Sequence, residues 1–221
     1  MAYNCPKDNR EFIQMLEQSG DLRTIEQEVD WDLEMGAITR RVCELQAPSP
    51  YFKKIKDYPG FRSLGAPMAT YRRLAIAMGM DADASIPEIA DEYVKRTQEA
   101  PIAPVTIDAS EAPCKQNILL GDDANLLHLP GPMVHDGDGG RYLATWHFVV
   151  SKDPDNQDIN WGMYRMMVFD EKTMVGPVLP FSDMGKMFHG KYAPRNQPMP
   201  FAAVLSADPV SSLASCAPSP M

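Results

Sequence analysis

The spacing of apolar side chains predicts helices with a few strands in the first part of the chain. Helices are expected over residues 8–19, 33–46, 70–80 and 85–100, and a strand, a turn and a second strand over 51–68. The first helix has Asp8 or Asn9 as its N-cap and Gly20 as its stop. The fourth has Ser85 as its N-cap with Glu88 three residues on, the spacing of a capping box.

After about residue 100 the pattern changes to short apolar runs separated by proline, glycine and aspartate. Strands are expected over residues 104–108, 117–120, 142–153, 159–170, 174–181 and 200–209. This change predicts an α+β fold, with an N-terminal α/β domain over residues 1–110 and a β-rich domain over residues 111–221.

Arg165 is the residue that the strand pattern explains least. Alternation over residues 159–170 places it among large apolar side chains, on the face opposite Asn160 and Gly162. Burying a guanidinium costs roughly several kcal/mol unless a carboxylate or a bound anion pairs with it. Residues 135–165 otherwise read as a β-hairpin with a long polar loop, so Arg165 is the reason to expect a pocket with an anionic ligand.

Composition excludes several classes of protein. The chain has 221 residues, 44% of them hydrophobic and 23% charged, as in globular proteins. Its net charge is −9 and its basic residues cluster only in pairs, which argues against a nucleic-acid partner. No apolar run reaches transmembrane length, and the N-terminus lacks the apolar core of a signal peptide. Four cysteines without a CxxC pair fit neither a zinc site nor a disulfide framework, so a reducing cytoplasm is expected.

Several motifs follow one another in an order that resembles the UbiD family of prenylated-flavin-dependent decarboxylases. They are DGGRY at residues 138–142, a DP turn at 153–154 and NWGMYR at 160–165. The likeness extends to residues 21–42, 60–80 and 201–220, and so to the whole chain. It implies that the β-rich domain is a split β-barrel that binds flavin, incomplete in this chain.

The resemblance implies a set of site residues. The cofactor-binding positions that match are Asn160, Trp161, Gly162, Met163, Arg165, Ser182 and Ser215. Asn160 matches a ligand of the divalent metal, manganese or magnesium, on the cofactor phosphate. Arg165 matches the active-site arginine on the side of the pocket that receives the substrate carboxylate. Potassium would be held by main-chain oxygens of Ser215 and Ala217, with Asp158 as a further ligand.

The sequence departs from the family pattern at two places. Asp183 stands where the family has a metal-ligating histidine; a carboxylate is a good ligand for manganese or magnesium, and His189 is the rival. Among the other histidines, His135 is the best candidate because it abuts the glycine-rich turn. The family's proton-handling glutamates and a third metal-ligating glutamate have no counterpart, since no residue after Asp208 is acidic. The chain is therefore expected to be an N-terminal portion of a longer enzyme, or to be completed by another chain.

The spacing of Asn160 and Arg165 carries a geometric prediction. They are five residues apart, so a regular strand would point them to opposite faces. If both serve one pocket, a bulge or kink is expected near Gly162, where glycine makes it cheap.

The implied function is reversible non-oxidative decarboxylation of a small aromatic acid, hydroxybenzoate-type, or of an α,β-unsaturated acid. Loss of CO2 leaves an electron pair that no side chain can accept, so prenylated FMN would supply the sink, with Mn2+ or Mg2+ and K+ at its phosphate. Aryl-CoA thioesters stay open as substrates, and the full-length protein is expected to be a homo-oligomer. The alternative is a non-catalytic flavin- or phosphate-binding subunit; a purely structural β-domain would leave Arg165 unexplained.

Overall fold

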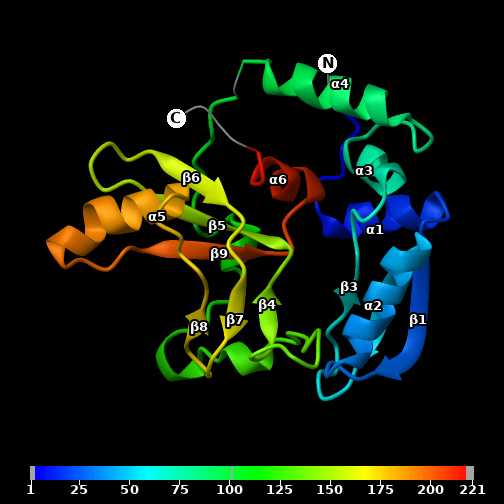
Figure 1. Ribbon diagram of the computed structural model, residues 1–221, viewed down its shortest axis with the longest axis horizontal. Coiled ribbons are helices and arrows are strands. Elements are labelled where there is room, and N and C mark those ends of the chain that lie inside the picture. The colour runs from blue at the N-terminus through cyan, green and yellow to red at the C-terminus, as the bar shows by residue number, and fades with distance from the viewer. Residues whose placement is uncertain (1–2, 101, 218–221) are drawn as a thin grey trace.

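The computed structural model describes residues 3–100 and 102–217. Its helices and strands form two units side by side (Figure 1). The N-terminal unit contains α1 (Asn9–Gln18), β1 (Leu22–Val29), α2 (Glu34–Leu45), β2 (Ser49–Ile55), β3 (Ser63–Leu64), α3 (Tyr71–Ala77) and α4 (Ile86–Thr97). β2 lies in the middle of a three-stranded sheet, parallel to β1 and antiparallel to β3. All four expected helices are present.

Local signals explain the helix ends of this unit. The Asp8 side chain accepts hydrogen bonds from two backbone N–H groups of α1, and Ser85 and Glu88 form the expected capping box. The sequence pattern does not predict β1. Its sequence is mostly polar, and only Val29 of its eight residues is fully buried. The core is formed by two clusters of buried side chains: Phe12, Leu16, Ile76 and Ala77, and Val29, Met35, Phe52 and Ile55.

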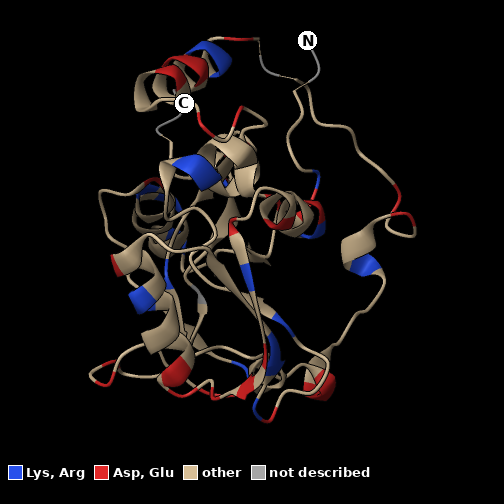
Figure 2. Ribbon diagram, turned by 90° about the vertical axis from the view of Figure 1, so that its right-hand side faces the viewer, with Lys and Arg blue, Asp and Glu red and all other residues tan. Residues whose placement is uncertain are grey.

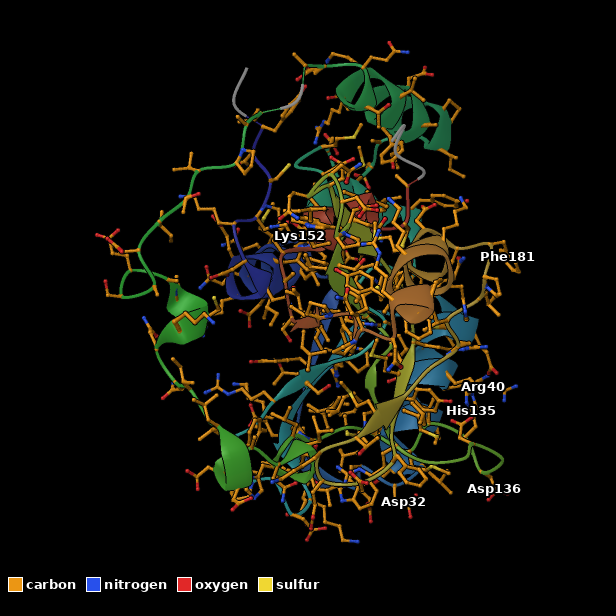
Figure 3. The ribbon with its side chains drawn as sticks, turned by 90° about the vertical axis from the view of Figure 1, so that its left-hand side faces the viewer. Asp32, Arg40, His135, Asp136, Lys152 and Phe181 are labelled. Atoms are coloured by element: carbon orange, nitrogen blue, oxygen red, sulfur yellow. The ribbon has the colours of Figure 1, made fainter. Side chains whose placement is uncertain are left out.

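Residues 102–120 join the two units as an extended segment on the outside of the molecule, seen as the green chain at the edge of Figure 3. The strands predicted over 104–108 and 117–120 are wrong, since this segment holds only turns and the short 3-10 helix Pro113–Lys115. Its apolar side chains are open to solvent, with Ile102 95% and Val105 84% exposed. β-branched composition favours a strand only where a neighbouring strand pairs with the backbone, and none of the described residues does so here.

The C-terminal unit consists of two antiparallel sheets and two short helices. Its strands are β4 (Tyr142–Ala144), β5 (His147–Lys152), β6 (Ile159–Gly162), β7 (Met166–Val168), β8 (Met174–Val175) and β9 (Phe201–Leu205), arranged as β4-β7-β8 and β6-β5-β9. Its helices are α5 (Asp183–Met187), which continues as the π-helix Phe188–Tyr192, and α6 (Pro209–Ala214). The long strands expected over 142–153 and 159–170 are each divided in two, and the strand expected over 174–181 is only two residues long. The fold is α+β, as predicted.

Contacts between the units fix their arrangement. The Arg141 guanidinium lies over the Trp31 ring at 4.1 Å and its Nε donates to the Gly131 carbonyl. Leu213 of α6 packs against the buried side chains Ala75, Met78 and Ile89 of the N-terminal unit. Figure 1 shows α6 accordingly between the two units, below α4.

Charged residues are mixed in sign on the helices. Figure 2 shows acidic segments followed by a basic segment at the end of α4, where Glu92 pairs with both Lys95 and Arg96. Within the described residues, no helix has the length and apolar character needed to cross a bilayer.

Candidate functional site

The strand that carries Asn160 breaks after Gly162, as the spacing of Asn160 and Arg165 predicted. β6 ends at Gly162 in one sheet, and the chain resumes as β7 at Met166 in the other. A Cβ atom on residue 162 would lie 2.4 Å from the Tyr164 ring. The absence of a side chain at residue 162 therefore leaves room for the Tyr164 ring to fold back against β6.

His147 holds this break from the inside. It is fully buried at the start of β5, and its Nε2 donates to the Tyr164 carbonyl at 2.8 Å. Tyr164 lies between β6 and β7, so its carbonyl has no partner among the described residues of either sheet. The imidazole of His147 supplies the hydrogen bond that this backbone carbonyl needs. Burial lowers the pKa of His147, although its bond to the Tyr164 carbonyl acts in the opposite direction. The side chain is therefore neutral near pH 7.

The Tyr164 hydroxyl links Asn160 to the start of α5. It accepts hydrogen bonds from the Met184 N–H at 3.1 Å and from the Asn160 Nδ2 at 3.5 Å. Ser182 is the N-cap of α5 and accepts a bond from the Gly185 N–H. Asn160 and Met184, the neighbour of Asp183, are thus joined through one phenol, although 24 positions separate them in the sequence.

Asn160 and Asp183 together fit part of a site for a hard divalent cation. The Asn160 Nδ2 donates a hydrogen bond to the Tyr164 hydroxyl, and the Asn160 side-chain oxygen makes no hydrogen bond within the described residues. The Asp183 carboxylate is partly exposed and lies 3.0 Å from the Lys186 Nζ. Oxygen donors of these two kinds suit Mn2+ or Mg2+. The described residues contain no group of three or more His, Cys, Asp or Glu able to hold a metal, so further ligands are needed.

The expectation that Arg165 is buried is wrong. Gly162, Met166 and Val168 form the buried face of this segment, whereas Arg165 lies on the exposed face with Trp161, 47% exposed, and Phe169, 69% exposed. No ion pair involves Arg165 in the described part of the chain. Alternation gave the two faces correctly but could not say which of two apolar faces packs inward.

Two cavities lie away from these residues. One, of about 510 Å3, lies between the two units: α2, β2 and the 60–67 segment line it on one side, and residues around Pro130, β4 and the end of β9 line it on the other. The second, of about 730 Å3, is lined mainly by α1, β2 and the 60–64 segment. Asn160, Arg165 and Asp183 line neither of them. The candidate site is accordingly an open surface of the C-terminal unit.

The remaining flavin positions lie around the same break. Trp161 stacks on Phe148 with ring centroids 4.6 Å apart. The Met163 sulfur lies 3.9 Å from the Cys216 Sγ, which brings the end of α6 beside the break. Ser215, next to Cys216, is buried, and its hydroxyl donates to the Ser212 carbonyl.

Two of the potassium candidates are less closely tied to the break. The Ala217 N–H donates to the Ala214 carbonyl at the end of α6. The Asp158 main-chain oxygen accepts a bond from the Asp153 N–H inside the polar loop, and its carboxylate accepts one from Asn156. No hydrogen bond within the described residues joins Asp158 to Ser215 or Ala217.

The two candidate histidines already have partners within the C-terminal unit. The His189 Nε2 lies 3.2 Å from the Val178 carbonyl, on the exposed side of the π-helix. His135 is paired with Asp138 within its own loop. Figure 3 shows His135 well separated from Phe181, which lies just before α5.

The burial of His147 predicts a pH-dependent stability. The folded chain holds His147 neutral, whereas the unfolded chain binds a proton below a pH of about 6.5. Stability is therefore fully present above that pH and is lost as the pH falls toward the lowered folded pKa, with a slope of up to about 1.4 kcal/mol per pH unit. Urea unfolding of the wild type and of His147→Gln between about pH 7.5 and pH 5 measures the difference. The exposed His135→Gln is the control; a wild-type slope shared by His147→Gln would contradict the prediction.

Comparisons with known proteins agree with this architecture. The chain matches the UbiD_N description, "3-octaprenyl-4-hydroxybenzoate carboxy-lyase N-terminal domain", over residues 13–93. It matches the UbiD description, "3-octaprenyl-4-hydroxybenzoate carboxy-lyase Rift-related domain", over residues 105–221. The two matched regions correspond to the N-terminal α/β unit and to the β-rich unit of the structure. The chain belongs to the UbiD family.

Individual relatives are similar over almost the whole of this chain. Pyrrole-2-carboxylic acid decarboxylase of Pseudomonas aeruginosa is 35% identical, over 96% of this chain and 44% of its own length. Ferulic acid decarboxylase 1 of Saccharomyces cerevisiae is 34% identical, over 96% and 44%. The closed form of vanillic acid decarboxylase from Sedimentibacter hydroxybenzoicus superposes with a TM-score of 0.90 at 28% identity, over 99% of this chain and 46% of that one.

A flavin-containing structure is also similar. The UbiD-class enzyme HmfF from Pelotomaculum thermopropionicum in complex with FMN has a TM-score of 0.82 at 26% identity, over 93% of this chain and 44% of that one. The chain therefore spans less than half the length of these relatives.

Proposed function

We propose that this chain is the flavin-binding part of a reversible carboxy-lyase that uses prenylated FMN. The observation that carries the proposal is the strand break at Gly162, which gathers Asn160 and the start of α5 around Tyr164 and presents Arg165 from the same segment. Relatives named as decarboxylases of pyrrole-2-carboxylic and ferulic acids, and an HmfF structure with prFMN, support a flavin-dependent reaction on an aromatic or α,β-unsaturated acid. Our choice is a hydroxybenzoate-type acid.

The roles of the chain's own residues follow from their chemistry. Bound prenylated FMN would supply the electron sink for the pair left behind by CO2. Asn160 and Asp183 would hold Mn2+ or Mg2+ against the cofactor phosphate, and main-chain oxygens of Ser215, Ala217 and Asp158 would hold K+. Backbone and side chains at 161–163 and Ser182 would line the flavin.

Arg165 would orient the substrate carboxylate. A guanidinium forms paired, charge-assisted hydrogen bonds with a carboxylate, and Arg165 has no acidic partner among the described residues that would compete. Its position on the same short segment as Asn160 supports a substrate carboxylate close to the cofactor phosphate.

Proton transfer is proposed to depend on residues outside this chain. The last acidic residue is Asp208, and the site is open on the side of Arg165. We place the boundary of the two domains near residue 110, expect a homo-oligomer for the complete protein, and favour the cytoplasm because all four cysteines are unpaired. The same open surface favours the second candidate, a non-catalytic flavin-binding subunit that a partner completes.

Reconstitution with prenylated FMN, Mn2+ and K+, followed by desalting and a flavin spectrum, tests the proposal. Stoichiometric flavin is expected to remain with the wild type and to be lost from Asn160→Ala, because the amide oxygen is part of the phosphate and metal site. Asn117→Ala, on the exposed linking segment, is the matched control and should retain flavin. A wild type that retains none would contradict the proposal. Decarboxylation by the loaded chain would identify an enzyme, and a loaded but inert chain would identify the subunit.

A further inference from the structure

We propose that Tyr164 is a positioning residue that sets the Asn160 and Asp183 oxygens relative to one another. This rests on the proposed function for the assignment of Asn160 and Asp183 to a bound metal. Tyr164 is held at both ends: its carbonyl by His147 at 2.8 Å, and its hydroxyl by the Met184 N–H at 3.1 Å and the Asn160 Nδ2 at 3.5 Å. One residue therefore connects β5, β6 and α5.

The path of the Tyr164 side chain is fixed by its surroundings. The ring lies against the bare Cα of Gly162, where any side chain would displace it. It also packs against the buried cluster of Val149, Met166 and Met184. Because the ring is confined on these sides, the position of the Tyr164 hydroxyl is fixed. A positioning residue requires such a fixed position.

The hydroxyl then orients both groups that we assign to the metal. The Met184 N–H is one of the first N–H groups of α5, which have no partner inside the helix. By accepting this bond, Tyr164 fixes the start of α5 and so the position of Asp183. By accepting the Asn160 Nδ2, it turns the amide oxygen away from itself and leaves that oxygen free. Loss of such a supporting hydrogen bond typically weakens metal binding by about 10- to 100-fold.

Tyr164→Phe separates positioning from packing, since it keeps the ring and the carbonyl bond to His147 and removes only the hydroxyl. Tyr192→Phe is the matched control. Tyr192 is a buried tyrosine at the end of the helical continuation of α5, and its hydroxyl donates to the Lys152 carbonyl at 2.9 Å rather than to Asn160 or to residues 183–187. Tyr164→Phe loses two hydrogen bonds that the phenol accepts, and Tyr192→Phe loses one that the phenol donates, so both should show small losses of thermal stability.

The first measurement titrates Mn2+ alone into the wild type and both variants, followed by electron paramagnetic resonance. The dissociation constant is expected to rise about tenfold or more in Tyr164→Phe and to change less than about twofold in Tyr192→Phe. Equal affinities of Tyr164→Phe and the wild type, or an equal loss in Tyr192→Phe, would overturn the proposal.

The second measurement follows amide hydrogen exchange without metal. Exchange over residues 183–185 is expected to become faster in Tyr164→Phe and to stay unchanged in Tyr192→Phe, because only the first loses the acceptor of the Met184 N–H. Unchanged exchange in Tyr164→Phe would overturn the positioning role. Faster exchange together with a wild type that binds no Mn2+ would support the positioning role and overturn the proposed function instead.

Discussion

Replacing Gly185 with alanine is expected to lower the free energy of unfolding by about 3 kcal/mol, the upper end of the cost of overpacking. A Cβ atom on residue 185 would lie 1.8 Å from the Leu179 carbonyl oxygen and 3.0 Å from the Ser182 Oγ. The chain before α5 folds back over the helix here, since both the N–H and the hydroxyl of Ser182 donate to the Leu179 carbonyl. Backbone atoms cannot move away as the end of a flexible side chain can. The added methyl group must therefore distort this turn or shift α5 from its packed position.

Gly190→Ala is the matched control for this measurement by urea unfolding. Gly190 lies in the helical continuation of α5, and a Cβ atom there would meet nothing within 4 Å. Alanine at that position should leave stability unchanged or raise it by up to about 1 kcal/mol through helix propensity. A Gly185→Ala variant as stable as Gly190→Ala would show that the turn over α5 is not packed as described.

Replacing Phe52 with alanine is expected to destabilise the N-terminal unit by about 3–5 kcal/mol, the typical cost of removing a buried phenylalanine. Phe52 lies on the central strand of the sheet, has no exposed surface, and packs with Val29, Met35 and Ile55. Strands on both sides of β2 prevent the neighbours from closing the cavity that alanine would leave. Urea unfolding followed by circular dichroism measures the loss.

Phe61→Ala provides the comparison in the same unit. Phe61 is 40% exposed and contacts Tyr58 edge to face at 6.3 Å, so its loss should cost about 1 kcal/mol or less. Similar losses for Phe52→Ala and Phe61→Ala would mean that the described core is not the source of the stability of this sheet.

Structural features that depend on only a few neighbouring residues could be predicted from the sequence. The four helices and the capping box of Ser85 and Glu88 follow from side-chain periodicity and from unpaired N–H groups at helix starts. The break near Gly162 was expected only on the condition that Asn160 and Arg165 serve one pocket; the break is present, and whether the two residues share a pocket stays a prediction. The helices α5 and α6 were not foreseen, because α5 contains Gly185 and both are only five or six residues long, too short for a clear periodic pattern.

The helices of the N-terminal unit and the two faces of the segment at 159–170 are therefore written in the local sequence. Each depends on backbone geometry and on side chains no more than a few positions apart. Only the tertiary structure decided that the 102–120 segment stays outside the sheets, that Arg165 faces outward, and that Tyr164 meets Met184 and His147. These outcomes depend on which surfaces pack against each other, and such contacts join residues whose separation along the chain leaves no local pattern.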